Sequence, residues 1–469
     1  MFQIRINGQR LDLYAAQTIV LERYNPLFDF DVVRGAKVLD YTVPFSRTND
    51  KIFGHARLPQ APITDEVFFC EKYDGSELLE RGYVYLLGVL SNGYSISYSQ
   101  NLGEIFGDYQ RIPLNQIDFG SEAVPGSFTA AADHLTAKYC LPVVKNAAFY
   151  GTTIPAGFTG EMNSYGSGAY LANSPRVPML FLGWLLRQIE TLCGFTIRGE
   201  FVDDAAMQRL VLANTFSLDS LSTITYQNHL PEITIPDLLK ELRKLFNLAL
   251  FFDVRNRTLT INYADGLLNQ EPLLNWSAKF APSASRAPET ARRLELDWEL
   301  DSNDGRMKVR PTDYELYQSP GDTPLFPVKT RLSTLEKDVS TGLPLMEQPG
   351  ITPTNNQMNN KFSPRLLFWH GLVAGQPTAL PDYGSYRLAW HGTNNLVERF
   401  WKGYEQFRKK TTRRLLYANL NASDIAHIDH HRTVGQNIKI HVQGTNYLIG
   451  SQRIALPLNT LTELELLSV

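Results

Sequence analysis

A change of hydrophobic period within residues 390–469 restricts the fold more than any other feature of the sequence. Thr393 or Asn394 is expected to cap a helix there, because both side chains can accept hydrogen bonds from the first helical N–H groups. From Thr412 onward the period is two, which indicates β-strands. Before that point apolar residues recur at steps of three and four, the spacing of one helical stripe: Leu396, Val397, Phe400, Tyr404 and Phe407.

Strand signals dominate the end of the chain. The strand-like segments are RRLLYANL, IKIHVQGTNYLIGSQRIAL and TLTELELL, and the middle one predicts two strands that turn at Gly444 and Asn446. A short segment, SDIAHI, predicts one capped turn of helix between them. Residues 390–469 are therefore predicted to form a C-terminal helix-plus-β domain.

The N-terminus carries a β-hairpin signal. Phe2, Ile4 and Ile6 alternate with polar residues up to Asn7-Gly8, a pair that favours a type I′ turn. Short β-rich runs separated by turn residues continue from there. We predict an antiparallel β domain over residues 1–115.

The middle of the chain combines loops, helices and strands. Residues 116–176 are rich in Gly, Ser, Thr and Pro and are predicted to be a loop-rich insertion. Residues 177–275 are predicted to be a helix and β-hairpin domain, with helices over 178–193 and after Pro236. In the hairpin after the second helix, Leu259, Ile261 and Tyr263 are expected to face inward, and Thr258, Thr260 and Asn262 outward.

Residues 276–389 are predicted to form a β-rich domain. In its first strand, Leu294, Leu296, Trp298 and Leu300 alternate with acidic residues expected to lie on a solvated face. The long polar segment 341–364 is predicted to be a loop with little core contact, open to proteolysis. The fold class expected for the whole chain is α+β and mainly β, with antiparallel β-barrel-like domains and interposed helix-plus-hairpin units.

Composition excludes several classes of protein. With 45 Lys and Arg against 48 Asp and Glu, the net charge of -3 gives no general attraction to nucleic acid or an anionic membrane. No apolar run approaches the roughly 20 residues of a membrane span, so no membrane insertion is expected. Cys70, Cys140 and Cys193 lack metal-site spacing and are expected to be buried thiols.

The sequence predicts no catalytic residue and no cofactor. The motifs GxGxxG, GxxxxGK[ST], HExxH and GxSxG do not occur, and Gly166-Ser167-Gly168 lies in a loop without strand-turn-helix context. The strongest metal candidates are His427, Asp429, His430 and His431, whose imidazoles and carboxylate suit zinc or manganese. Such a site needs further carboxylates, so a polar connection between helix and strand is the preferred interpretation and no metal is predicted.

Three further patterns have structural explanations. Asp301-Ser302-Asn303-Asp304-Gly305 resembles a calcium loop but lacks its Gly and Glu positions, so a turn is predicted. The repeats Trp369-His370-Gly371 and Trp390-His391-Gly392 are expected to place each Trp in a core and each His against a neighbour. The last pattern is a cluster of basic residues, which could either bind phosphate or form the solvated end of a helix. The solvated helix end is the preferred interpretation. The cluster consists of Arg408, Lys409, Lys410, Arg413 and Arg414.

Three long segments carry a resemblance to a known class of proteins. They are SRTNDKIFGHA, PDLLKELRKLFNLALFFDVRNRTLTINY and the closing region from WHGTNNLVERFWKGYEQF to GTNYLIGSQRI. In the pattern of their hydrophobic residues and in a few Gly, Trp and Asn positions, these segments resemble those of structural tail proteins in prophages of Bacteroidetes-type bacteria. No catalytic motif is matched, so no active-site residue is carried over.

The resemblance implies a non-enzymatic baseplate or tail-tip hub of the virion tail, assembled in the bacterial cytoplasm. Such a protein forms a homo-oligomeric ring, commonly a trimer, that joins tail tube to tip proteins and leaves a passage for DNA. Strand edges of the terminal β regions are the expected contacts between copies.

Two alternatives stay open at the level of sequence. One is a tail-tip hydrolase of peptidoglycan or surface glycan, which would show a deep cleft with two converging carboxylates. The other is a carbohydrate-binding protein, which would show an exposed aromatic platform.

Overall fold

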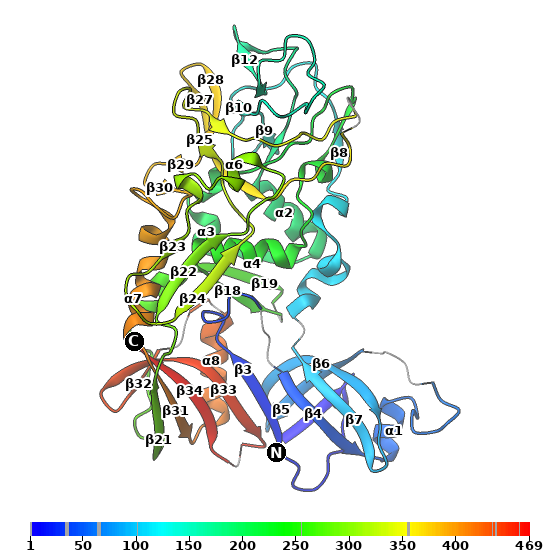
Figure 1. Ribbon diagram of the computed structural model, residues 1–469. Helices are drawn as coiled ribbons and strands as arrows, with labels where there is room; N and C mark the ends of the chain where they lie inside the picture. The colour runs from blue at the N-terminus through cyan, green and yellow to red at the C-terminus, as the bar shows by residue number, and fades with distance from the viewer. Residues whose placement is uncertain are drawn as a thin grey trace.

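The computed structural model describes residues 2–32, 37–62, 67–100, 102–254, 256–353, 357–433, 435–436, 439–458 and 460–469. The protein is mainly β with several helices, and most strand pairs are antiparallel, as predicted. Figure 1 shows two β regions side by side at the base and a mixed region above them. How the chain divides into domains remains a prediction.

The N-terminal β unit is a half-barrel. The NG hairpin is confirmed, with Asn7 and Gly8 both at positive φ. The inward side chains of its strands form a separate core, which includes Ile4, Phe68 and Ile96. Its elements are β1 (Phe2–Ile6), β2 (Gln9–Arg10), β3 (Ile19–Tyr24), β4 (Lys37–Pro44), α1 (Arg47–Ile52), β5 (Val67–Asp74), β6 (Glu77–Val89) and β7 (Gly93–Ser99).

The C-terminal β unit draws strands from two distant parts of the chain. The predicted hairpin is confirmed, but its turn lies at Gln443 and Gly444, both at positive φ, and Asn446, which was predicted to be in the turn, lies in the second strand of the hairpin. The predicted single helical turn is instead a helix of three turns, α8. Its elements are β20 (Leu274–Asn275), β21 (Phe280–Pro288), β31 (Thr412–Ala418), α8 (Ala422–Thr433), β32 (Lys439–Val442), β33 (Thr445–Leu456) and β34 (Thr462–Ser468).

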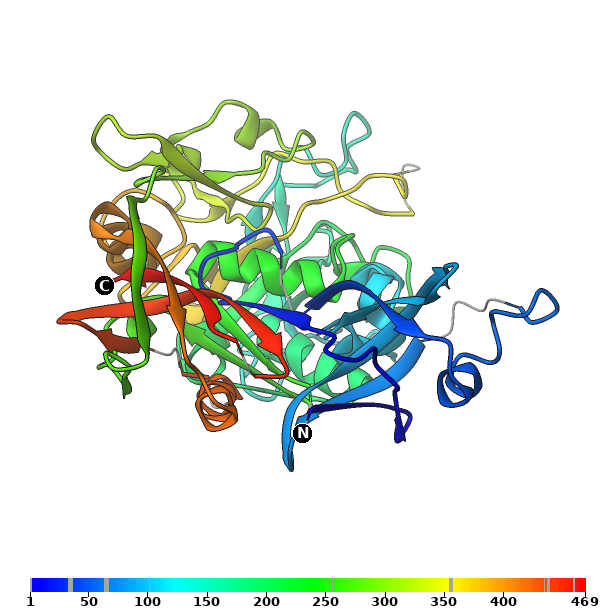
Figure 2. The same cartoon turned by 90° about the horizontal axis from the view of Figure 1, so that it is seen from below.

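The two β units belong to one 13-stranded sheet. They meet where β3 pairs with β33 in an antiparallel register that runs from Ile19 opposite Leu456 to Tyr24 opposite Ser451. In the view from below, the blue β3 and the red β33 lie next to each other between the units (Figure 2). The outermost strands of the ordered sheet are β2 at one end and β21 at the other.

The mixed region above the sheet is held by helices. The second predicted helix is confirmed as α4, which Thr234 caps by accepting a hydrogen bond from Asp237 N. The first begins only at Leu182, because residues 179–181 pair as a strand with β16 and β9. The helices are α2 (Leu182–Cys193), α3 (Glu200–Asp203), α4 (Ile235–Phe246), α5 (Ala264–Leu268), α6 (Gly305–Lys308) and α7 (Lys402–Lys410), with a π-helical turn at Val397–Trp401.

Short strands connect these helices. The strands are β8 (Ser121–Ala123), β9 (Tyr139–Cys140), β10 (Val144–Lys145), β11 (Glu161–Met162), β12 (Tyr165–Gly166), β13 (Ala169–Tyr170), β14 (Met179–Phe181), β15 (Thr196–Arg198), β16 (Leu210–Ala213), β17 (Thr223–Thr225), β18 (Leu248–Asp253), β19 (Thr258–Tyr263), β22 (Arg293–Trp298), β23 (Tyr317–Gln318), β24 (Leu325–Thr330), β25 (Glu336–Lys337), β26 (Pro344–Leu345), β27 (Arg365–Val373), β28 (Gln376–Leu380), β29 (Asp382–Tyr383) and β30 (Tyr386–Arg387). The 3₁₀ turns are Leu102–Arg111, Leu114–Gln116, Met207–Arg209, Tyr226–His229 and Thr312–Tyr314.

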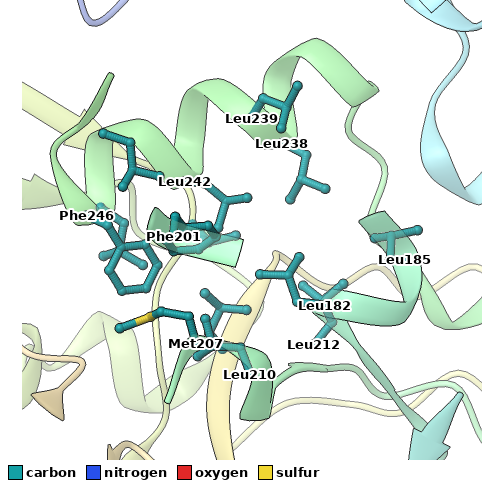
Figure 3. Close-up of a cluster of buried hydrophobic side chains, with 14 of the residues drawn as sticks. Leu182, Leu185, Phe201, Met207, Leu210, Leu212, Leu238, Leu239, Leu242 and Phe246 are labelled. Carbon is teal, nitrogen blue, oxygen red and sulfur yellow. The ribbon is translucent and has the colours of Figure 1, made fainter. Parts of the chain in front are cut away.

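The main core lies between α2 and α4. Figure 3 shows Leu182 and Leu185 from α2 facing Leu238 and Leu242 from α4, with Phe201 between the helices. These side chains are nearly inaccessible to solvent, so this cluster holds the mixed region together. No helix in the described ranges is long and apolar enough to cross a membrane.

The expectation that segment 341–364 has little core contact is wrong. Met346 and Gln348 are 1% and 0% exposed, and Gln348 Nε2 donates to the carbonyl oxygen of Lys361. Met346 N also donates to Lys145 O in β10. The segment therefore fills a gap between short strands, which its polar composition does not reveal.

Two faces predicted to be solvated are partly covered, and Leu300, predicted to face inward, is exposed together with Glu299. Asp297 and Asp301 are 4% and 5% exposed, and they pair with Arg310 and Arg365 respectively. Thr258 and Thr260 in the hairpin are buried as well, and Gly435 lies against Thr260. Amphipathic alternation identifies one covered face of a strand but gives no information on what packs against the other.

The helix at the beginning of the C-terminal region starts at a different residue from the one predicted. Asn395, and neither Thr393 nor Asn394, accepts the capping hydrogen bond from Glu398 N. A π-helical turn follows, and Asp265 accepts hydrogen bonds from Gly403 N and Tyr404 N at the beginning of α7. The five residues of the predicted apolar stripe are all buried.

Candidate functional site: the junction of the two β units

The junction of the two β units contains a largely buried charge network that links β3, β6 and α8. Arg23 on β3 donates to Glu80 on β6 through Nε at 3.0 Å and Nη2 at 2.7 Å. Its Nη1 donates to Asp429 on α8 at 2.8 Å. The Arg23 and Glu80 side chains are 2% and 7% exposed, so these are largely desolvated ion pairs.

Helix α8 bridges the two units at this point. Ile425 packs into the core of the N-terminal β unit, and Ile428 packs into the core of the C-terminal β unit. Asp429 follows directly and faces Arg23. One helix therefore contributes an apolar side chain to each unit and a carboxylate to the network between them.

A second buried cation lies close to this network. Lys72 on β5 is fully buried, and its Nζ lies 2.9 Å from the ring centroid of Tyr98, with no hydrogen-bond partner in the described part of the chain. Glu80 is its partner across the β5–β6 ladder. Burial lowers the pKa of Lys72 from 10.5 to about 7 and raises the pKa of the Cys70 thiol to about 11.

A hollow of about 300 Å³ lies near the junction and is lined by three carboxylates. Glu22 and Glu463 are both paired with Arg453, and Glu465 is paired with Arg413. Each of these carboxylates is held in an ion pair with an arginine, an arrangement that does not suit a general acid of glycoside hydrolysis, which must carry a proton to give to the leaving group.

The four metal candidates do not converge. His427 and His430 are exposed on α8, whereas Asp429 faces Arg23. His431 is bonded through Nδ1 to Gln436 Oε1 at 2.8 Å. No group of three or more His, Cys, Asp and Glu side chains that could hold a metal ion occurs among the described residues. These four residues lie in the second half of the helix, and not in a connection between helix and strand as predicted.

The other sequence candidates have structural partners. Trp369 and Trp390 are buried, and His370 and His391 bond to the carbonyl oxygens of Asp382 and Leu316, as predicted. Asp304 caps α6 within the predicted turn, and Arg365 pairs with both Asp301 and Asp304.

The basic cluster after α7 is only partly solvated. Arg408 is 6% exposed, pairs with Glu289 and lies over the ring of Phe326. Arg413 also pairs with Glu289. The expectation of a solvated helix end is wrong for Arg408, whose charge is used inside the protein.

Sequence reasoning missed Arg23, Glu80 and Lys72. One signal was present, because Lys72 continues the inward positions set by Phe68 and Cys70 on β5. A charged residue at an inward position of a strand indicates a buried charge. The partners of Arg23 come from strands and a helix far apart in the sequence, and no local pattern identifies them.

Exposed aromatic residues are scarce in the described part of the chain. Among the aromatic residues that the structure describes, only Tyr14 and Phe69 are exposed, and the Phe69 ring packs edge-on against Tyr83. These two exposed rings do not amount to a platform of several rings of the kind expected of the carbohydrate-binding alternative.

Comparisons with known proteins give structural likeness only. No protein-family model matches the chain, and no curated protein matches it. It is similar to the 43 kDa tail protein of prophage MuSo2 from Shewanella oneidensis, with 9% identity and a TM-score of 0.39 over 99% of this chain and 97% of that one.

Two further solved structures are similar over the full length. Prophage tail protein gp18 from Listeria monocytogenes has 9% identity and a TM-score of 0.36, covering 99% of this chain and 94% of that chain. The tail protein from Neisseria meningitidis has 10% identity and a TM-score of 0.36, covering 99% and 95%.

Proposed function

We propose that the chain is a structural protein of a phage or prophage tail, acting as a hub at the baseplate or tail tip. The class is suggested by the sequence resemblance described above. The proposal rests mainly on one observation. The two β units lie side by side in one sheet, and the strand at one end of this sheet belongs to the N-terminal unit while the strand at the other end belongs to the C-terminal unit. The protein assembles with its neighbours and does not turn over a substrate.

Unlike sheet ends suit a ring of copies. A closed ring needs a heterologous contact, in which one surface of a copy meets a different surface of the next. Strand β2 lies at one end of the sheet and β21 at the other, so one copy can present its N-terminal unit to the C-terminal unit of the next. A trimer closes such a ring around an axial passage for DNA, with tube proteins on one side and tip proteins on the other.

The end strands favour contact through side chains. Strand β2 has two residues, and β21 contains Pro282 and Pro288, which lack an N–H donor. Such edges resist open-ended strand addition. We therefore expect the ring contact to combine a short backbone pairing with side chains on the outer surface of these strands.

Edge substitution tests this assembly. Ala287→Glu introduces a carboxylate on the exposed edge strand β21 and should prevent co-assembly with the neighbouring tail proteins. Val339→Glu is the matched control, because Val339 is fully exposed on the mixed region, away from both end strands. Co-assembly of both variants at the level of the unmodified chain would exclude β21 as a ring contact.

The enzymatic alternative is tested separately. Purified protein is incubated with peptidoglycan and surface glycan, and released fragments are measured. The proposal predicts no release above that of heat-denatured protein. Turnover lost on Glu463→Gln would contradict it.

A further inference from the structure

Two arginines lie directly opposite each other at the C-terminal end of the 13-stranded sheet. Arg286 on the outermost strand β21 is paired with Arg414 on β31, so their side chains share one face of the sheet. Such a position brings Cβ atoms to about 5 Å, and like charges there destabilise a sheet. The chain therefore carries an unfavourable charge pair at this end, which an anionic group would neutralise.

The hydrogen-bond acceptors of these two arginines within the chain are neutral. Arg286 Nε donates to Thr412 Oγ1 at 3.3 Å. Arg414 donates to the Tyr447 hydroxyl through Nη1 at 3.1 Å and to Gln443 Oε1 through Nη2 at 3.2 Å, and these bonds hold its guanidinium in place. In the ranges that the structure describes, no carboxylate forms an ion pair with either arginine.

Carboxylates near the same strands are used by a different arginine. Arg413 pairs with Glu289 at 3.2 Å and with Glu465 at 2.6 Å. Because successive residues of a strand point to opposite faces, the Arg413 side chain lies on the face away from Arg414. Strands β21 and β31 therefore have one face with neutralised charge and one face with two cations that lack an ion-pair partner among the described residues.

The β5–β6 hairpin of the N-terminal β unit has the opposite arrangement of charge. Asp74 and Glu77 lie directly opposite each other and flank its two-residue turn, Gly75-Ser76. They share one face at the tip of the hairpin, at the same cross-strand spacing as the two arginines. Glu77 is exposed and Asp74 is partly exposed, so a second molecule can reach both carboxylates.

The two charge pairs lie in different parts of the sheet. In the strand order, β7, β4, β3, β33 and β34 lie between β6 and β31. Figure 1 shows β21 and the β5–β6 hairpin on opposite sides of the junction between the two β units. A contact between the two charge pairs therefore requires two chains.

We propose that the arginine pair, Arg286 and Arg414, of one copy binds the carboxylate pair, Asp74 and Glu77, of a second copy. This inference rests on the proposed hub and names the residues of its contact between copies. The planar donor fork of an arginine matches a carboxylate, so two such contacts side by side fix how the copies are aligned. Each copy uses one pair toward each neighbour, which is the heterologous contact that a closed ring needs.

A second copy fits the arginine pair better than a DNA phosphate does. Non-specific binding to DNA depends on the number of phosphates that basic groups neutralise, and the chain as a whole has a net charge of -3. The carboxylate pair matches the arginine pair in number and in spacing. Binding of DNA is therefore treated as an outcome of the test.

Charge reversal tests the contact. Light scattering measures the oligomer that forms with the neighbouring tail tube and tip proteins at about 0.1 M salt, where charges within about 10 Å still interact. Reversal of the arginine pair (R286E with R414E) should weaken association about a hundredfold or more, because like charges would meet. Reversal of the carboxylate pair (D74R with E77R) should do the same. The chain with all four substitutions should associate like the unmodified chain.

The matched control is Lys308→Glu with Lys337→Glu. It changes the net charge as much as reversal of the arginine pair does, on exposed lysines of the mixed region, and should associate like the unmodified chain. Thermal unfolding shows first which variants fold. If a reversed variant does not, Arg286→Gln with Arg414→Gln replaces it. Association of the unmodified chain should weaken about tenfold between about 0.1 M and about 0.5 M salt, and the glutamine variant should lose most of this dependence.

Three results would overturn the proposal. The first is an oligomer that neither reversal affects, and the second is loss in both reversals without recovery in the folded chain that has all four substitutions. The third is binding of a short DNA duplex that reversal of the arginine pair abolishes while the oligomer persists. All three leave the hub standing, because the unmodified chain still forms its oligomer. An unmodified chain that forms no oligomer in any condition would contradict the hub as well.

Discussion

Arg23 and Asp429 are 406 positions apart in the sequence, yet Arg23 Nη1 lies 2.8 Å from Asp429 Oδ1. The same guanidinium donates to Glu80, so one side chain links β3, β6 and α8. This link connects the first strands of the chain with its last helix. The mutual position of the two β units therefore depends on a buried ion network as well as on the β3–β33 ladder.

Arg23→Met should destabilise the protein strongly. The change leaves Glu80 buried without its partner, and breaking a buried ion pair in this way costs about 3–5 kcal/mol. The free energy of unfolding is measured by urea denaturation. Lys361→Ala is the matched control, because Lys361 and Glu232 are 71% and 49% exposed, and such a pair contributes about 1 kcal/mol or less. Equal losses in the two variants would contradict the network described here.

Lys72→Met should stabilise the N-terminal β unit. The folded pKa of Lys72, about 7, lies below its ordinary value of 10.5, so between these values the unfolded chain binds more protons and stability rises with pH. The methionine variant should lose this rise and gain up to about 3–5 kcal/mol at neutral pH and below. Urea midpoints across the alkaline range test this. A methionine variant less stable than the unmodified chain at every pH would show that the amine has a stabilising partner.

Deletion of segment 341–364 should destabilise the fold. Met346 is buried in the main core, and its replacement by alanine alone should cost about 2–5 kcal/mol. Thermal unfolding of Met346→Ala and of the deletion variant tests this. Met358→Ala is a control in the same segment, since Met358 is 52% exposed. A deletion variant with an unchanged midpoint would restore the interpretation as a loop without core contact.

Gly403→Ala should disrupt the start of α7. A Cβ at this position would lie 2.7 Å from the Asp265 carboxyl group, which accepts the Gly403 and Tyr404 N–H groups. Removing this clash requires movement of α5 or α7, so a loss of about 1–3 kcal/mol is expected. Gly126→Ala is the control, because nothing lies within 4 Å of its added Cβ. Equal unfolding midpoints for the two variants would contradict this packing.

The predictable parts of the fold are those decided locally. Asn7-Gly8 gives the first turn because both residues adopt positive φ, and Gly194 ends α2 in the left-handed conformation for the same reason. The apolar stripe from Leu396 to Phe407 was visible because a helix places such residues on one side. These features need no information from distant residues.

The parts that sequence could not predict depend on distant partners. The sequence pattern predicts Asp301 on a solvated face. In the structure Asp301 is buried by its partner Arg365, which lies on a strand much later in the chain and is not visible in the local pattern. The candidate site is an extreme case, since the partners of Arg23 lie on β6 and α8. A buried charge is permitted only by the groups that surround it, and those are known only after the chain is folded.

The molar mass of the assembled protein tests the central claim most directly. Light scattering is measured on the purified chain alone and then with the neighbouring tail tube and tip proteins. The account predicts a closed oligomer of this chain, a trimer, in at least the second condition, and its loss in Ala287→Glu. A strict monomer of this chain in both conditions would contradict a hub.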